Sequence, residues 1–133
     1  MKDKVSQGKK NRAAGARFER NVRRDLERKE WIVAKWMNNV TDGELHAARQ
    51  AWNPFKKVLS IGTGFPDFIA FKTNYVLETC RDVIAVEAKI NGILSKQEKE
   101  KCQWYLKNKI FYKILIAYQG IDEIKYKEVK QNE

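Results

Sequence analysis

Residues 64–71 read Gly-Phe-Pro-Asp-Phe-Ile-Ala-Phe, and residues 83–89 read Val-Ile-Ala-Val-Glu-Ala-Lys. Both runs have the length and the apolar content of buried strands. Side chains alternate between the two faces of a strand, which predicts Glu87 and Lys89 on one face of the second run. If the two runs pair in one sheet, Asp67 lies beside them. The sequence therefore predicts two carboxylates and one amine around a single point.

Charged groups at the end of a buried strand are costly to desolvate unless they have partners or a ligand. Mg²⁺ is held by one or two carboxylates together with substrate phosphates. Asp67, Glu87 and Lys89 thus predict a centre for metal-assisted phosphodiester hydrolysis. The structural alternatives are that Asp67 caps backbone amides after the proline and that Glu87 and Lys89 form a cross-strand ion pair.

The order and strand context of these motifs resemble those of the PD-(D/E)XK nuclease superfamily over roughly residues 12–118. The stretch 15–20 (GARFER), followed by an apolar run, is similar to the first helix and strand of archaeal Holliday-junction resolvases. The stretch 94–98 (LSKQE) opens a helix, as in the same group. The stretch 62–67 (GTGFPD) also resembles the virus-type replication-repair nuclease branch of this superfamily.

This resemblance implies a restriction-endonuclease-like core, an α/β fold with a central mixed sheet flanked by helices. It implies hydrolysis of DNA by metal-activated water, with products carrying 5′-phosphate and 3′-hydroxyl ends. Asp67, Glu87 and the carbonyl of Ala88 would hold Mg²⁺, with Mn²⁺ as a substitute. Glu19 would bind a second metal or position water, and Lys89 would orient the attacking water or stabilise developing charge.

Two of the implied catalytic residues lie on helices and have plain alternatives. Glu19 could instead form an ordinary surface pair with Arg23, four residues further on. Gln97 lies in the first turn of the helix that a capping box of Ser95 and Glu98 predicts. The resemblance implies a polar residue near the site there, and the alternative is an exposed helix glutamine.

The chain carries 27 Lys and Arg against 17 Asp and Glu, a formal net charge of +10. This balance favours nucleic acid as a partner, with an anionic membrane surface second. Residues 1–30 alone hold eleven basic and five acidic residues, and phosphate contact explains this clustering because neutralised phosphates release counterions. The alternative is a solubilising basic tail. The expected nucleic-acid contacts are Lys9, Lys10, Arg12, Arg17, Arg20, Lys56, Lys57 and Lys96.

The connection from about 38 to 64 is too long to be structureless in a compact domain, so we expect a short helix at 44–52. Trp52 and Phe55 precede two lysines, and we expect the two aromatic side chains to cover the sheet edge. Base stacking is the alternative. The glycines at 62 and 64 lack side chains and would let a DNA strand approach the backbone closely.

The length fits one domain at 12–130, preceded by a flexible basic tail at 1–11. The periodicities predict helices at 12–29 and 95–108 and strands at 31–37, 65–71, 82–89 and 111–118, with an edge strand or loose tail at 121–129. Cys80 and Cys102 lack a zinc-site spacing, and both are expected to be reduced, with Cys102 facing the core. No apolar run is long enough for a membrane span or a signal peptide, so an intracellular protein that does not bind membranes is expected.

Three further functions compete with the resolvase-like one. The chain could be a basic DNA-binding protein without catalysis, whose acidic cluster is structural. It could also be a nuclease acting on linear or single-stranded DNA, or one acting on RNA. A symmetric homodimer is expected for cleavage of both strands, since a twofold axis supplies two centres.

Overall fold

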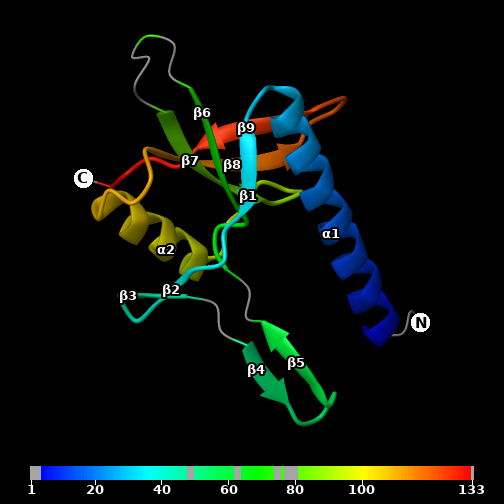
Figure 1. Ribbon diagram of the computed structural model, residues 1–133. Helices are drawn as coiled ribbons and strands as arrows, with labels where there is room; N and C mark the ends of the chain where they lie inside the picture. The colour runs from blue at the N-terminus through cyan, green and yellow to red at the C-terminus, as the bar shows by residue number, and fades with distance from the viewer. Residues whose placement is uncertain (1–3, 48–49, 62–63, 74–75, 77–80, 133) are drawn as a thin grey trace.

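The computed structural model describes residues 4–47, 50–61, 64–73, 76 and 81–132 (Figure 1). Its centre is a five-stranded sheet in the order β1-β6-β7-β8-β9. The β7–β8 pair is parallel and the other three pairs are antiparallel, which confirms the expected α/β fold with a mixed sheet. The elements of this core are α1 (Lys4–Arg28), β1 (Ile32–Lys35), β6 (Phe68–Thr73), β7 (Arg81–Ala88), α2 (Lys96–Lys107), β8 (Lys113–Gln119) and β9 (Ile124–Glu128).

The two helices cover opposite faces of the sheet, because β7 presents apolar side chains to both sides. Ile84 and Val86 pack in one core cluster with the α1 stripe of Phe18, Val22 and Leu26. The other cluster joins Ala85 of β7 and two isoleucines of β8 to α2, whose Cys102 and Tyr105 are fully buried. The predicted alternation along residues 83–89 and the core position of Cys102 are confirmed, whereas Cys80 lies outside the described residues.

Helix α1 begins at Lys4, two turns before the expected start near residue 12. Lysine and glutamine are good helix formers, and three lysines with one glutamine make up half of residues 4–11. The Gln7 side-chain amide also donates a hydrogen bond to Asn11 Oδ1, one turn further on, at 3.0 Å. Helix propensity therefore extends α1 toward the amino terminus, beyond the residues that pack on the sheet. Within the described residues, no helix is both long enough and apolar enough to cross a membrane.

The long connection forms two hairpins, so the expected helix at 44–52 is wrong. Strands β2 (Asn39–Thr41) and β3 (Glu44–His46) form the first hairpin, and β4 (Gln50–Asn53) and β5 (Val58–Ile61) form the second. Asp42 and Gly43 join β2 to β3 with φ angles of 53° and 74°. An Asp-Gly pair with two positive φ angles is the preferred two-residue hairpin turn. This dipeptide was the local signal for the first hairpin.

The remaining elements follow the expected pattern with small shifts at their ends. Strand β1 is shorter than 31–37, and β6 begins at Phe68 rather than at 65. The capping box is present, because Ser95 Oγ accepts from the Glu98 amide and Glu98 Oε1 accepts from the Ser95 amide. Helix α2 then ends at Lys107 with Asn108 as its cap. Residues 124–128 form the edge strand β9, one of the two alternatives for that segment.

Candidate metal centre

Asp67 lies immediately before β6, at the end of the sheet where the antiparallel neighbour β7 finishes. The register pairs Phe68 with Val86, which brings Asp67 next to Glu87. Asp67 Oδ2 accepts a hydrogen bond from the backbone amide of Ala88 at 2.8 Å. The two apolar runs therefore bring their acidic residues together, as the sequence predicts.

The loop before Asp67 is held by the main chain that follows β1. The Phe65 amide donates to the Asn38 carbonyl at 2.9 Å, and the Trp36 amide donates to the Asp67 carbonyl at 3.0 Å. A Cβ on Gly64 would overlap the Trp36 carbonyl. Gly64 is therefore required by contact with the chain's own backbone, which corrects the expectation that it leaves room for DNA. Residues 62 and 63 lie outside the described residues.

Glu87 is the most deeply buried acid of this cluster, with only 4% of its surface exposed. Burial raises the pKa of Glu87 well above its ordinary value, and the adjacent Asp67 carboxyl raises it further through a hydrogen bond and like charge. A buried pair of carboxylates cannot both ionise cheaply unless a cation lies between them or nearby. The pair is therefore suited to binding a proton or a divalent cation.

Glu19 reaches the same acidic cluster from α1. Burial raises the pKa of the Glu19 carboxyl, and the neighbouring Asp67 raises it further. Lys35 of β1 offsets part of this effect, with its Nζ 3.5 Å from Glu19 Oε2. The alternative pairing of Glu19 with Arg23 is wrong, because Arg23 binds Glu27 at 2.8 Å and donates to the carbonyl of Val33. Lys35 is a neighbour that the sequence did not single out.

Lys89 completes the cluster, but its closest partner is Glu98, which was expected only as part of the helix-capping box. Lys89 Nζ lies 2.6 Å from Glu98 Oε2 and 4.0 Å from Glu87 Oε2. Burial disfavours the charged amine, but Glu98 and Glu87 outweigh burial and raise the pKa of Lys89. The cross-strand alternative is therefore incomplete, since the main ion pair of Lys89 is with α2. The N3 position of the capping box was the available signal for Glu98.

Gln97 is exposed in the first turn of α2. It lines a depression of about 420 Å³ beside the β2–β3 hairpin, together with Thr41, Asp42 and Trp104. Its position agrees with the alternative of an exposed helix glutamine. A catalytic role for Gln97 stays a prediction.

The donor set fits a hard divalent cation. Among the described residues, no group of three or more His, Cys, Asp or Glu side chains is already close enough to hold a metal. Mg²⁺ does not need such a cage, since it commonly takes one or two carboxylates and keeps several waters. Asp67 and Glu87, which are neighbours at the ends of two paired strands, meet this requirement. The carbonyl of Ala88 and the Glu19 carboxylate are the further oxygen donors expected from the sequence.

The expected nucleic-acid contacts form two exposed groups. One group lies along α1, and the other lies at the turn of the β4–β5 hairpin, while Lys96 is exposed at the start of α2. The amino-terminal part of α1 and the β4–β5 hairpin project beyond the same end of the sheet (Figure 1). Trp52 is 59% exposed and Phe55 is 96% exposed. The expectation that these two aromatic residues cover the sheet edge is therefore wrong.

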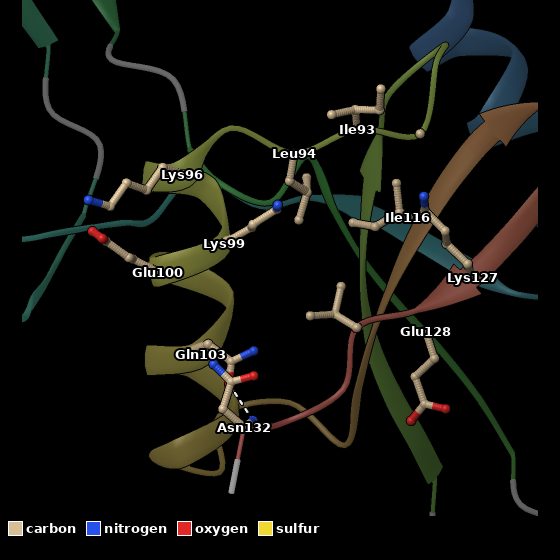
Figure 2. Close-up of a pocket in the computed structure, with 12 residues that line it drawn as sticks. Ile93, Leu94, Lys96, Lys99, Glu100, Gln103, Ile116, Lys127, Glu128 and Asn132 are labelled. Atoms are coloured by element: carbon tan, nitrogen blue, oxygen red, sulfur yellow. Dashed lines mark hydrogen bonds between the residues drawn. The ribbon is translucent and has the colours of Figure 1, made fainter.

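A second pocket, of about 730 Å³, lies between α2 and the end of β9, and Asp67 and Glu87 are not among its lining residues (Figure 2). Leu94, Ile116 and Val129 give it an apolar wall, and the side chains of Lys99 and Lys127 flank it. The pocket is not lined by the acidic cluster or by Lys89, whereas Lys96, one of the expected nucleic-acid contacts, does line it. Its lining offers no carboxylate pair comparable to Asp67 and Glu87.

No protein-family model, curated protein or solved structure matches this chain.

Proposed function

We propose that this chain is a metal-dependent endodeoxyribonuclease with a PD-(D/E)XK-type centre on a restriction-endonuclease-like core. The observation that carries the proposal is the meeting of Asp67 with Glu87 at the ends of paired strands, with Lys89 alongside. An acid pair and an amine at one sheet end are the parts required for hydrolysis of a phosphodiester. The net charge of +10 favours a polyanionic substrate.

Asp67 and Glu87, with the Ala88 carbonyl, would hold Mg²⁺ or Mn²⁺. When bound, the cation supplies positive charge to the phosphoryl group and lowers the pKa of a coordinated water. Lys89 contributes a fixed positive charge and hydrogen-bond donors beside the carboxylates, where the attacking water or the developing negative charge would lie. Glu19 would orient water from the α1 side, or share a second cation with Asp67.

Branched DNA, such as a four-way junction, is the substrate that the resemblance of residues 12–118 to resolvases supports, and linear or single-stranded DNA is the alternative. Cleavage of both strands would require two centres, for which we propose a symmetric homodimer. The second candidate function is DNA binding without catalysis. The exposed basic residues of α1 support it equally well, but it gives no reason for two carboxylates to meet beside a lysine at a sheet end.

Parallel measurements of binding and cutting on one set of substrates separate these candidates. The set is labelled four-way junction, flap, duplex and single-stranded DNA, with a single-stranded RNA of the same sequence, each incubated with Mg²⁺, Mn²⁺ or EDTA. The nuclease predicts cutting that requires the metal and disappears in Lys89→Ala, while that variant still binds DNA. Tight binding without cutting under either metal would instead establish the non-catalytic DNA-binding protein. Cutting of RNA alone would establish a ribonuclease.

A further inference from the structure

The turn of the β4–β5 hairpin holds a phenylalanine out into solvent. Asn53 Oδ1 accepts hydrogen bonds from the backbone amides of Phe55 at 3.0 Å and Lys56 at 3.1 Å. Lys57 closes the turn with a φ of 51°. The side chain of Asn53 thus fixes the backbone of the turn locally. On this turn, whose backbone is fixed by Asn53, Phe55 has 96% of its surface exposed.

The surroundings of Phe55 specify the kind of partner that would cover it. Lys56 and Lys57 follow it directly, and Trp52 on the same hairpin is 59% exposed. Residues 50–61 contain no acidic residue. An aromatic ring with cations and no anions beside it suits a partner that has both a flat apolar surface and negative charge. Nucleotides have this combination in every unit of the chain, as a base and a phosphate.

We propose that the β4–β5 hairpin binds unpaired nucleotides, with Phe55 stacking on an exposed base and Lys56 and Lys57 contacting the flanking phosphates. Base faces are accessible in single strands, forks and strand ends. In a continuous duplex they are covered by their neighbours, and a side chain must first unstack them at a cost in free energy. The hairpin therefore favours DNA with unpaired bases over continuous duplex.

This inference rests on the proposed nuclease function and specifies its substrate. The hairpin and the basic amino-terminal part of α1 project beyond the same end of the sheet, the end at which Asp67 precedes β6 (Figure 1). A nucleic acid bound along α1 would therefore lie at the end of the sheet where both the hairpin and the Asp67–Glu87 pair are found. Cutting would then occur close to where the bases become unpaired.

The test measures binding in EDTA, so that it does not depend on cutting. The probes are a forked DNA with single-stranded arms, one arm alone, and a continuous duplex of the same length, each with 2-aminopurine at the fork position. Phe55→Ala should weaken binding of the fork and of the single arm by about ten-fold and leave duplex binding nearly unchanged. Stacking on Phe55 should change the 2-aminopurine fluorescence of the fork and of the single arm when the wild type binds. Phe55→Trp should keep both the binding and this change, because it keeps a stacking ring.

Ile121→Ala is the matched control, since Ile121 is 95% exposed and lies in the β8–β9 connection, away from the hairpin. It should bind all three probes as the wild type does. Equal binding by wild type and Phe55→Ala, or an equal loss on the duplex, would overturn the inference. Phe55-dependent binding to phosphatidylserine vesicles without any Phe55 effect on the fork would also overturn it. If the wild type cuts DNA but Phe55 has no effect on fork binding, the hairpin inference fails and the proposed nuclease function is retained. If Phe55 contributes to fork binding as expected but no DNA is cut, the nuclease function fails and the hairpin inference is retained.

Discussion

Lys89 Nζ lies 2.6 Å from Glu98 Oε2, whereas its distance to Glu87 Oε2, on its own strand, is 4.0 Å. The second oxygen of Glu98 accepts from the Ser95 amide at 2.9 Å, so both oxygens of one carboxylate are occupied. The capping box at the start of α2 therefore does two things. It provides hydrogen-bond acceptors for backbone amides at the start of the helix, and it holds the Lys89 amine that the proposed chemistry uses.

Glu98→Gln separates these two roles. Glutamine at this position can still accept from the Ser95 amide, so the helix start and the free energy of unfolding should change little. Without the carboxylate, Lys89 loses its nearest anion and its fixed position, and kcat should fall by about 10- to 100-fold because misplacement of a reacting group is costly. Single-turnover cleavage at saturating DNA, together with thermal unfolding, measures both effects.

Ser95→Ala is the opposite variant, because it removes the cap and leaves the Lys89–Glu98 ion pair. It should lower the free energy of unfolding by about 1 kcal/mol while kcat stays close to that of the wild type. Equal kcat values for wild type and Glu98→Gln would show that Glu98 contributes only to the helix.

Glu87 makes the stability of the metal-free protein depend on pH. The pKa of Glu87 is raised in the folded protein from an ordinary value of 4.5, so above pH 4.5 the folded state binds more protons at this site than the unfolded state. The contribution of Glu87 to stability is therefore complete below pH 4.5 and is lost as the pH rises. Glu87→Gln should remove this loss, and in EDTA the variant should become progressively more stable than the wild type between pH 5 and about pH 9.

Thermal unfolding of the two proteins across this pH range tests the effect, and Mg²⁺ provides the control. Added Mg²⁺ should stabilise the wild type more at pH 8 than at pH 5, since protons compete for the carboxylates at the lower pH. It should leave Glu87→Gln almost unaffected. Parallel pH profiles for the two metal-free proteins would contradict the burial of an uncompensated acid pair.

Gly64 and Gly15 should respond to alanine in opposite ways. A Cβ at Gly64 would meet backbone atoms of Trp36 and Met37, which cannot move aside as a flexible side chain could. Gly64→Ala should cost about 3 kcal/mol or more and should displace the loop that positions Asp67. Gly15 lies within α1, and apart from the backbone of the helix itself no atom lies within 4 Å of an added Cβ, so Gly15→Ala should stabilise the protein by about 0.5–1 kcal/mol. Denaturant unfolding compares them directly, and a tolerated Gly64→Ala would refute the close backbone approach.

The exposed arginines of α1 should set the salt dependence of DNA binding. Removal of Arg17 and Arg20 together should reduce the slope of log K against log salt by about 2, because each lost phosphate contact releases about one counterion fewer. Lys107 and Lys109, both exposed where α2 ends, give a variant with the same change in net charge. Anisotropy titrations at several salt concentrations should show an unchanged slope for this control. Equal slopes for both double variants would mean that net charge, rather than the α1 surface, attracts DNA.

The sequence predicted the core because its signals there are local and repeated. The four-residue spacing of Phe18, Val22 and Leu26 and the alternation around Glu87 each identify a buried face without knowledge of the fold. Such local signals could not predict which side chains meet through tertiary contacts. The ion pair between Lys89 and Glu98 depends on how the turn after β7 returns to α2, and the pairing of Glu19 with Lys35 depends on where α1 crosses the sheet.

The prediction for the connection between β1 and β6 was wrong for a different reason. Its length suggested a helix, but the turn-forming pair of Asp42 and Gly43 was the stronger signal, because two positive φ angles suit that pair and the twist of a hairpin. Phe55 was expected to be covered because large aromatic residues usually are. Its exposure could be recognised only once the hairpin was seen to leave the sheet.

The most direct test of the central claim is the cleavage rate of Asp67→Asn beside that of the wild type, on a forked DNA at saturating protein with Mg²⁺. Asparagine keeps the size of the side chain and an oxygen that can accept from the Ala88 amide, so folding should be retained. We predict that the wild type cuts only when the metal is present and that Asp67→Asn cuts at least about 100-fold more slowly while binding the DNA at least as tightly. Cleavage that persists in EDTA, or that proceeds equally fast in Asp67→Asn, would contradict the assignment of this carboxylate pair as a metal-dependent nuclease centre.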